Sequence, residues 1–136
     1  MPLRYHPKQG TIVLVRFDKA FKLPEMVKAR PCIVISKRIK HRPNLVTVVP
    51  LSTTVPRPVM PYHCEIPVEV DLPKRWSAPS CWVKGDMVYA LSFERVDLFN
   101  LGRGTDGRRV YQTKTVSEET FAAVRRCVLA GLGLEP

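Results

Sequence analysis

The chain has 136 residues, 45% of them hydrophobic, which suits one domain (1–136) with its own core and is too short for two ordinary domains. Its 22 lysines and arginines against 12 aspartates and glutamates give a formal net charge of +10, a field suited to nucleic acid or to an acidic protein partner. No apolar run reaches the roughly 18 residues of a membrane helix and no secretory signal opens the chain, so we expect a cytoplasmic protein without a membrane span.

The first third of the chain predicts two strands joined by a long loop. Thirteen prolines argue against long helices, because proline removes a backbone donor and stops helices. The first strand is expected over Thr11 to Phe17, after a turn at Gly10, and the second over Pro31 to Ser36. The segment 18–29 between them is longer than most connections and is therefore a functional candidate.

The middle of the chain alternates short strands with proline-rich connections. The basic stretch 37–42 leads into further strands, expected at residues 45–51, 62–66 and 82–93, with irregular segments at 54–61 and 67–79. Gly85 and Asp86 mark a bulge or turn inside the last of these strands.

The C-terminal third predicts a hairpin and then a helix. Residues 102–107 are glycine-rich, and short β character returns at 109–113. Ser117 caps a helical run in which apolar residues recur at three- and four-residue spacing. Five to seven strands and one C-terminal helix predict a mainly β protein, a small antiparallel barrel or curled sheet capped by the helix.

The four cysteines predict neither a disulfide framework nor a metal site. They show no CxxC or CxxH spacing, and no secretory signal accompanies them: Cys32, Cys64, Cys81 and Cys127. We expect reduced thiols, and neither a metal nor a cofactor is expected.

Polar side chains stand at one end of two predicted strands. Arg30 enters the second strand, and Ser52 and Thr53 leave the third. If these strands are neighbours, a guanidinium, whose planar fork can bind two phosphate oxygens, and several hydroxyls converge on a candidate phosphodiester site. Two alternatives stay open: Arg30 as a surface charge, and hydroxyls that only end the strand through local hydrogen bonds. Alternation allows only one of Ser52 and Thr53 to face the site if the strand includes both.

The order of these features resembles the MazF/PemK family of toxin endoribonucleases. The resemblance rests on a strand-opening glycine, a glutamate five residues before Arg-Pro, two apolar strands and an H-x-E segment: Gly10, Glu25, Arg30-Pro31, IVIS at 33–36, VVPLSTT at 48–54, and His63 two before Glu65. It implies an SH3-like antiparallel barrel of the MazF/CcdB type with a C-terminal helix, in a homodimer. It also implies metal-independent cleavage of single-stranded RNA, mRNA above all, by the substrate 2′-hydroxyl, and an acidic antitoxin as partner.

The resemblance also assigns roles to individual residues. Arg30 occupies the position of the catalytic arginine, and Ser52 stands where the family usually has threonine, with Thr53 one place later. Glu25 is expected to orient Arg30 or hold the loop rather than accept a proton, because an ion pair makes a carboxylate a poor base. RNA contacts are expected from basic side chains of the loops and the fourth strand: Lys28, Lys37, Arg38, Lys40, Arg42, Arg57 and His63. For His63 a half-buried structural role is the alternative.

Three functions therefore compete at the level of the sequence. The first is a sequence-selective endoribonuclease toxin. The second is a non-catalytic SH3-like module that binds nucleic acid or protein. The third is a fold relative that poisons a protein target such as a topoisomerase and would not need Arg30 and Ser52.

Overall fold

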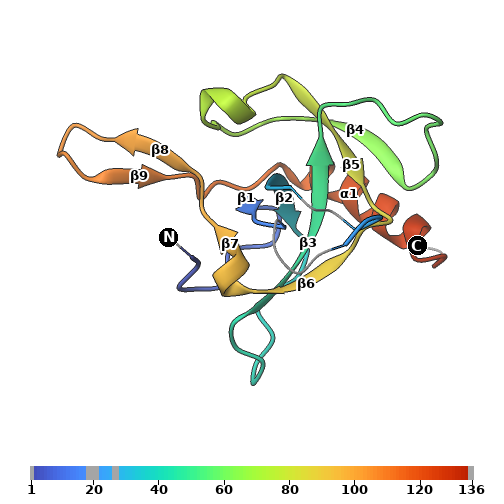
Figure 1. The fold of residues 1–136 in the computed structure, drawn as a ribbon, viewed down its shortest axis with the longest axis horizontal. Helices are drawn as coiled ribbons and strands as arrows, with labels where there is room; N and C mark the ends of the chain where they lie inside the picture. Colours follow the sequence, from blue (N-terminus) through green and yellow to red (C-terminus); the bar gives the residue numbers. More distant parts are fainter. Residues whose placement is uncertain (1, 18–21, 26–27, 135–136) are drawn as a thin grey trace.

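The computed structural model describes residues 2–17, 22–25 and 28–134 (Figure 1). The long loop predicted at 18–29 lies partly outside them, at 18–21 and 26–27. The elements in chain order are β1 (Ile12–Val15), β2 (Arg30–Val34), β3 (Leu45–Ser52), β4 (His63–Pro67), η1 (Lys74–Trp76), β5 (Ser80–Lys84), β6 (Tyr89–Ser92), η2 (Phe93–Arg95), β7 (Val96–Asp97), β8 (Asn100–Arg103), β9 (Arg109–Tyr111) and α1 (Glu118–Gly131).

The long strand β3 organises the main sheet. The hydrogen-bonded strand order is β4-β5-β3-β2-β1-β7, with β6 also paired to β3, and every pair is antiparallel. The first half of β3 pairs with β6 and its last two residues pair with β5, whereas β2 lies along its other edge. The hairpin β8–β9 forms a separate two-stranded sheet that projects away from the rest of the molecule (Figure 1).

The expected SH3-like barrel is corrected to an open sheet. The path of paired strands ends at β4 on one side and β7 on the other, and within the described residues no ladder joins these two strands. Because the two halves of β3 recruit different partners on the same edge, the sheet diverges into two arms instead of closing. The mainly β fold with a C-terminal helix is confirmed.

The single strand predicted at 82–93 is two strands. A turn at Gly85 and Asp86 separates β5 from β6, and the Met87 amide closes it by donating to the carbonyl oxygen of Lys84 at 3.1 Å. The glycine at this position has a packing reason, because a Cβ on Gly85 would lie 2.6 Å from the backbone carbonyl of Cys127 in α1. The helix therefore rests directly against the turn.

Both faces of the sheet are buried, which the alternation along the strands explains. On β3, Val46 and Val48 belong to one apolar cluster, which also contains Val13 of β1. Val49 and Leu51 of the same strand belong to the other cluster. The second cluster includes Val124 and Cys127 of α1, so the helix covers that face. Among the described residues, no helix is long and apolar enough to cross a membrane.

The start of α1 is held by two polar side chains. Ser117 is the predicted N-cap, and its hydroxyl oxygen accepts a hydrogen bond from the Thr120 amide at 3.2 Å. Glu69, from the loop after β4, accepts from the Ser117 amide at 3.1 Å. Hydrogen bonds from Thr120 and Ser117 to the carboxylate lower the pKa of Glu69, although the side chain is largely solvent-exposed.

Candidate active site

Arg30 opens β2, where it pairs with Val15 of β1, so its backbone is fixed by the sheet. The side chain is half-buried, and its Nε atom is buried without a hydrogen-bond partner among the described residues. A buried guanidinium N–H without a partner carries a desolvation cost, because such donors are normally paired. The rest of the fork lies at a cleft that an anion can enter.

Ser52 and Thr53 lie on the same cleft. Ser52 ends β3 and is 8% exposed, and its hydroxyl oxygen accepts a hydrogen bond from the Thr54 amide at 3.1 Å. This local bond is the strand-ending contact that the sequence left open, and it leaves the hydroxyl proton available to a ligand. Because β3 stops at Ser52, strand alternation no longer applies to Thr53, and both residues line the cleft.

The cleft encloses about 280 Å³ between the sheet and the segment that carries η1. Arg75 and Trp76 of η1 line it as well, and the Arg75 guanidinium lies 4.6 Å from the centroid of the Trp76 ring. The edge of Trp76 also packs on Phe99, at 6.2 Å between ring centroids. The sequence interpretation missed Arg75 because it treated 67–79 as an irregular insert. The run Lys-Arg-Trp at 74–76, an aromatic next to basic residues, was the available signal.

Glu25 is not among the residues that line this cleft. Its side chain is exposed, and its carboxylate accepts a hydrogen bond from the Lys22 amide at 2.7 Å. Residues 26–27, which connect it toward Arg30, lie outside the described part of the chain. The contact observed is local and holds a turn.

The residues predicted to bind RNA fall into separate regions. Lys28 is exposed two residues before Arg30, and Arg57 is exposed in the loop after β3. His63 begins β4, is half-buried, and accepts a hydrogen bond at Nδ1 from the Met60 amide at 3.1 Å. The remaining four side chains are exposed on the loop between β2 and β3, at the other end of these strands: Lys37, Arg38, Lys40 and Arg42.

The ionisable groups around the cleft are positive or neutral. Burial raises the pKa of the Cys32 thiol, against the opposing effect of the Arg30 charge, and it raises the pKa of Cys81 to about 12, so both thiols stay protonated at neutral pH. Among the described residues, no aspartate, glutamate or histidine lines the cleft. The described lining residues that carry polar chemistry are guanidinium groups and hydroxyls, which can bind phosphate and stabilise negative charge.

The described residues show no group of three or more histidine, cysteine, aspartate or glutamate side chains that could hold a metal ion.

Fold and cleft together define a class: a small antiparallel sheet with a C-terminal helix that places an arginine and two hydroxyls at the end of adjacent strands. The chain belongs to the family of PemK-like, MazF-like toxins of type II toxin–antitoxin systems, whose model matches residues 8–132. The resemblance seen in the sequence is thereby confirmed.

Solved structures share the fold at low sequence identity. An endoribonuclease in complex with its cognate antitoxin, from a mycobacterial species, has a TM-score of 0.62 at 17% identity, covering 96% of this chain and 98% of that one. MazF (Form-I) from Deinococcus radiodurans has a TM-score of 0.60 at 20% identity, with 96% and 99% covered. The Mycobacterium tuberculosis toxin MazF-mt6 has a TM-score of 0.58 at 15% identity, and the match covers 93% of this chain and 99% of that one. No curated protein sequence matches the chain.

Proposed function

We propose that this protein is a metal-independent endoribonuclease toxin that cleaves single-stranded RNA, mRNA above all, at selected sequences through the Arg30 cleft. The observation that carries the proposal is Arg30 at a cleft that also holds the Ser52 and Thr53 hydroxyls, with a buried Nε that has no hydrogen-bond partner among the described residues. A phosphate oxygen in the cleft would supply an acceptor for the guanidinium fork. Family membership and the structural likeness to proteins described as endoribonucleases support the same activity.

The reaction is a transesterification within the RNA. The 2′-oxygen of one nucleotide attacks the adjacent phosphorus, the bond from phosphorus to the 5′-oxygen breaks, and a 2′,3′-cyclic phosphate and a 5′-hydroxyl result. The proton lost by the 2′-hydroxyl is balanced by the proton gained at the leaving oxygen. Negative charge grows on the non-bridging phosphate oxygens as the pentacovalent state forms, and stabilising that charge is the largest contribution such a site can make.

Each cleft residue has a proposed part in this step. Arg30 binds the non-bridging oxygens with its planar fork and neutralises their charge. A hydroxyl, from Ser52 or Thr53, donates a hydrogen bond to the phosphate or to the leaving oxygen. Arg75 adds a second positive charge to the cleft, beside the Trp76 ring. Because no aspartate, glutamate or histidine stands among the described lining residues, the 2′-hydroxyl proton passes to the phosphate, to water or to a group outside that lining. We keep Glu25 as a positioning residue of the loop that precedes Arg30.

Partners and assembly are part of the same proposal. Neighbouring structures are described as toxins in complex with an antitoxin, and the formal net charge of +10 suits an acidic one here. We also propose a homodimer in the cytoplasm, with further phosphate contacts from Lys28, Arg57 and His63. Light scattering of the purified protein tests the dimer, and protection of RNA by a short acidic polypeptide tests the antitoxin.

A cleavage assay in EDTA tests the central claim. Wild-type protein is incubated with mixed-sequence RNA, and the ends of the products are mapped. We expect cuts at a limited set of sites, cyclic-phosphate and 5′-hydroxyl ends, and loss of both in Arg30→Ala. Arg108→Ala, which removes an exposed arginine from the β8–β9 hairpin, is the charge-matched control and should cleave as wild type does. Cleavage that persists in Arg30→Ala overturns the proposal.

The lack of an aspartate, glutamate or histidine among the described residues of the cleft lining favours one second candidate, a module that binds RNA without cutting it. The same assay separates the two, because such a module retards RNA on a gel and leaves its length unchanged.

A further inference from the structure

A second and larger cleft lies at the opposite end of the strands that carry Arg30 and Ser52. It encloses about 590 Å³ between the N-terminal segment, the β2–β3 loop and the start of η2. Because β2 and β3 are antiparallel, the loop that joins them lies at the end away from Arg30. From Leu45 to Ser52 the strand covers seven steps, or about 23 Å at about 3.3 Å per residue.

The charged side chains that line this second cleft, among the described residues, are all basic. Three arginines and two histidines line it, and none of the lining residues in the described part of the chain is an aspartate or glutamate. The two arginines of the loop, Arg38 and Arg42, are exposed. A cluster of guanidinium groups without local carboxylates attracts anions, and phosphate is the anion that the guanidinium fork fits best.

One wall of the cleft is held in place by a chain of hydrogen bonds. His6 Nδ1 lies 2.6 Å from the carbonyl oxygen of Pro7, which can only accept, so Nδ1 carries a proton. His6 Nε2 lies 3.1 Å from the hydroxyl of Ser36, which accepts from the Thr47 amide at 2.9 Å. In the neutral imidazole, Nε2 therefore accepts from the Ser36 hydroxyl. The N-terminal segment is thus fastened to the sheet, and His6 acts as a positioning residue.

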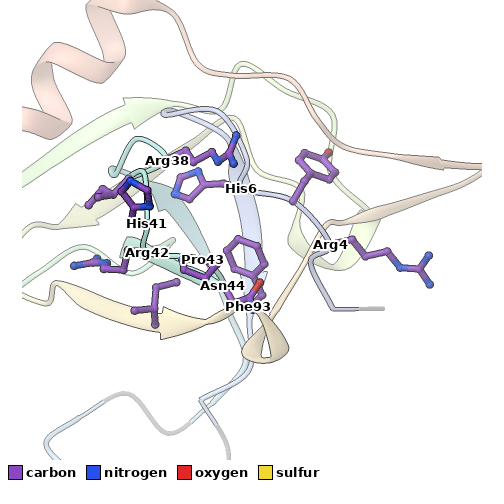
Figure 2. Close-up of a pocket in the computed structure, with 11 residues that line it drawn as sticks. Arg4, His6, Arg38, His41, Arg42, Pro43, Asn44 and Phe93 are labelled. Carbon is purple, nitrogen blue, oxygen red and sulfur yellow. The ribbon is translucent and has the colours of Figure 1, made fainter.

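The β2–β3 loop is also folded rather than loose. The Arg42 amide donates to the carbonyl oxygen of Ile39 at 3.1 Å, and the Asn44 carbonyl oxygen accepts from the Phe93 amide at 2.9 Å. Asn44 has a φ of 64°, in the left-handed region that asparagine tolerates. Figure 2 shows Arg38, His6 and Phe93 around one hollow, whereas Arg4 extends away from them. The loop arginines are thereby held at a formed cleft.

Aromatic and polar groups accompany the charge. Tyr5, which is 51% exposed, the buried Phe93 and Asn44 also line the cleft. An exposed ring next to guanidinium groups is the combination by which proteins hold unpaired bases and their phosphates. A volume of this size falls within the range of pockets for small organic ligands.

We propose that this second cleft binds a nucleotide of single-stranded RNA remote from the scissile bond, with its phosphate on Arg38 and Arg42 and its base against Tyr5. The identity of the strand rests on the proposed endoribonuclease function. Because the two clefts are about 23 Å apart by strand rise, only a strand longer than the reacting dinucleotide can occupy both. Occupation of both converts the second contact into an intramolecular one and raises the affinity for long strands.

The test compares the affinities of a long and a short strand. Uncleavable 2′-O-methyl RNAs of about three and about twenty nucleotides are titrated by fluorescence anisotropy, lengths that bracket common single-strand site sizes, and the shorter one cannot span the distance between the clefts. The test variant is Arg38→Ala/Arg42→Ala, and the control is Arg108→Ala/Arg109→Ala, which removes the same charge from the exposed β8–β9 hairpin. Because a longer strand also offers more binding registers, the quantity compared is the ratio of long to short affinity in the two variants.

We expect the test variant to lose about tenfold in that ratio relative to the control, because the phosphate at the second cleft loses both of its guanidinium contacts. Thermal unfolding of both variants, at the wild-type midpoint, establishes that the loop change has not unfolded the chain. Equal ratios in the two variants overturn the proposal.

A second measurement places the ligand. The backbone amide signals of Asn44 and Leu45 should shift in an NMR titration with the long strand and not with the short one. If polyglutamate shifts these signals and neither RNA does, the cleft belongs to an acidic peptide and the proposal is wrong. Neither measurement requires cleavage, so failure of the cleavage assay and failure of this second site are distinguishable.

Discussion

The two ends of β2 and β3 are both positively charged, yet they are built differently. At the Arg30 end the polar groups are fixed by the sheet and partly desolvated, in a cleft of about 280 Å³. At the loop end the arginines are exposed at the rim of a cleft of about 590 Å³. Electrostatic stabilisation of a transition state requires preorganised groups away from water, whereas phosphate binding needs only accessible charge. One end of the sheet thus meets the requirement for stabilising a transition state, and the other end meets only the requirement for binding phosphate.

Replacing arginine by lysine should have a large effect at the Arg30 end and a small effect at the loop end. Arg30→Lys keeps the charge but loses the planar fork, and we expect single-turnover cleavage to fall by about 10²- to 10³-fold, the loss typical of removing one preorganised donor. Arg38→Lys retains a cation at an exposed position, so long-strand affinity should change by no more than about threefold. Equal effects at both ends would contradict the contrast between half-buried and exposed charge.

The hydroxyls of Ser52 and Thr53 allow a second comparison, between a buried and an exposed side chain at the Arg30 end. Ser52→Ala should lower cleavage and also reduce the free energy of unfolding by about 1 kcal/mol, because the Thr54 amide loses its side-chain acceptor. Thr53 is exposed, so Thr53→Ala should change stability by less than about 0.5 kcal/mol, and a fall in cleavage then reports chemistry alone. Denaturant unfolding and single-turnover rates provide the two measurements.

Ser52→Thr is the matched control for this pair, since it keeps the hydroxyl and adds the β-branch that the family usually has. It should restore both stability and cleavage relative to Ser52→Ala. If Ser52→Ala cleaves at the wild-type rate while Thr53→Ala does not, Thr53 is the residue that contacts the phosphate.

The strands were predictable because their signals are local. β-branched runs placed β1, β2 and β3 within a few residues, and Ser117 placed the start of α1. The convergence of Arg30 with Ser52 followed from antiparallel pairing of consecutive strands, which is the common arrangement. The helix cap followed from a serine before two glutamates.

The features that could not be predicted depend on contacts between distant segments. The open sheet results from β3 sharing one edge between β5 and β6, and no periodicity within residues 45–52 encodes two partners. Arg75 reaches the cleft only because Trp76 of η1 packs on Phe99, in a segment without regular spacing. The second cleft joins residues near positions 5, 40 and 93, which only the folded chain brings together.

The thiols extend the contrast between buried and accessible groups beyond the two clefts. A hydrogen bond from the Cys127 thiol lowers the pKa of Cys64, and the Arg126 charge acts in the same direction. Burial raises the pKa of Cys32. We expect iodoacetamide to label Cys64 first and Cys32 last in the folded protein, with labelling of Cys64 rising through a pH below the ordinary thiol value. Cys127→Ala should slow the labelling of Cys64, which peptide mapping by mass spectrometry would detect. Labelling of Cys32 at the rate of Cys64 would contradict this order.

The smallest expected effect lies at the exposed start of α1, remote from both ends of the strands. Hydrogen bonds from the Thr120 side chain and from Ser117 to the Glu69 carboxylate hold its pKa below the ordinary value. A carboxyl whose pKa is lower in the folded state contributes stability above its unfolded pKa and loses it as the pH falls through the folded pKa. Glu69→Gln should therefore lower the thermal midpoint slightly at neutral pH, and the difference from wild type should vanish in acid. Thermal unfolding of the two proteins across this pH range provides the measurement, with Glu119→Gln, on the first turn of the same helix, as the control for charge near the helix dipole. A difference between Glu69→Gln and wild type that persists in acid would show that the hydrogen bonds to Ser117 do not require the ionised carboxylate.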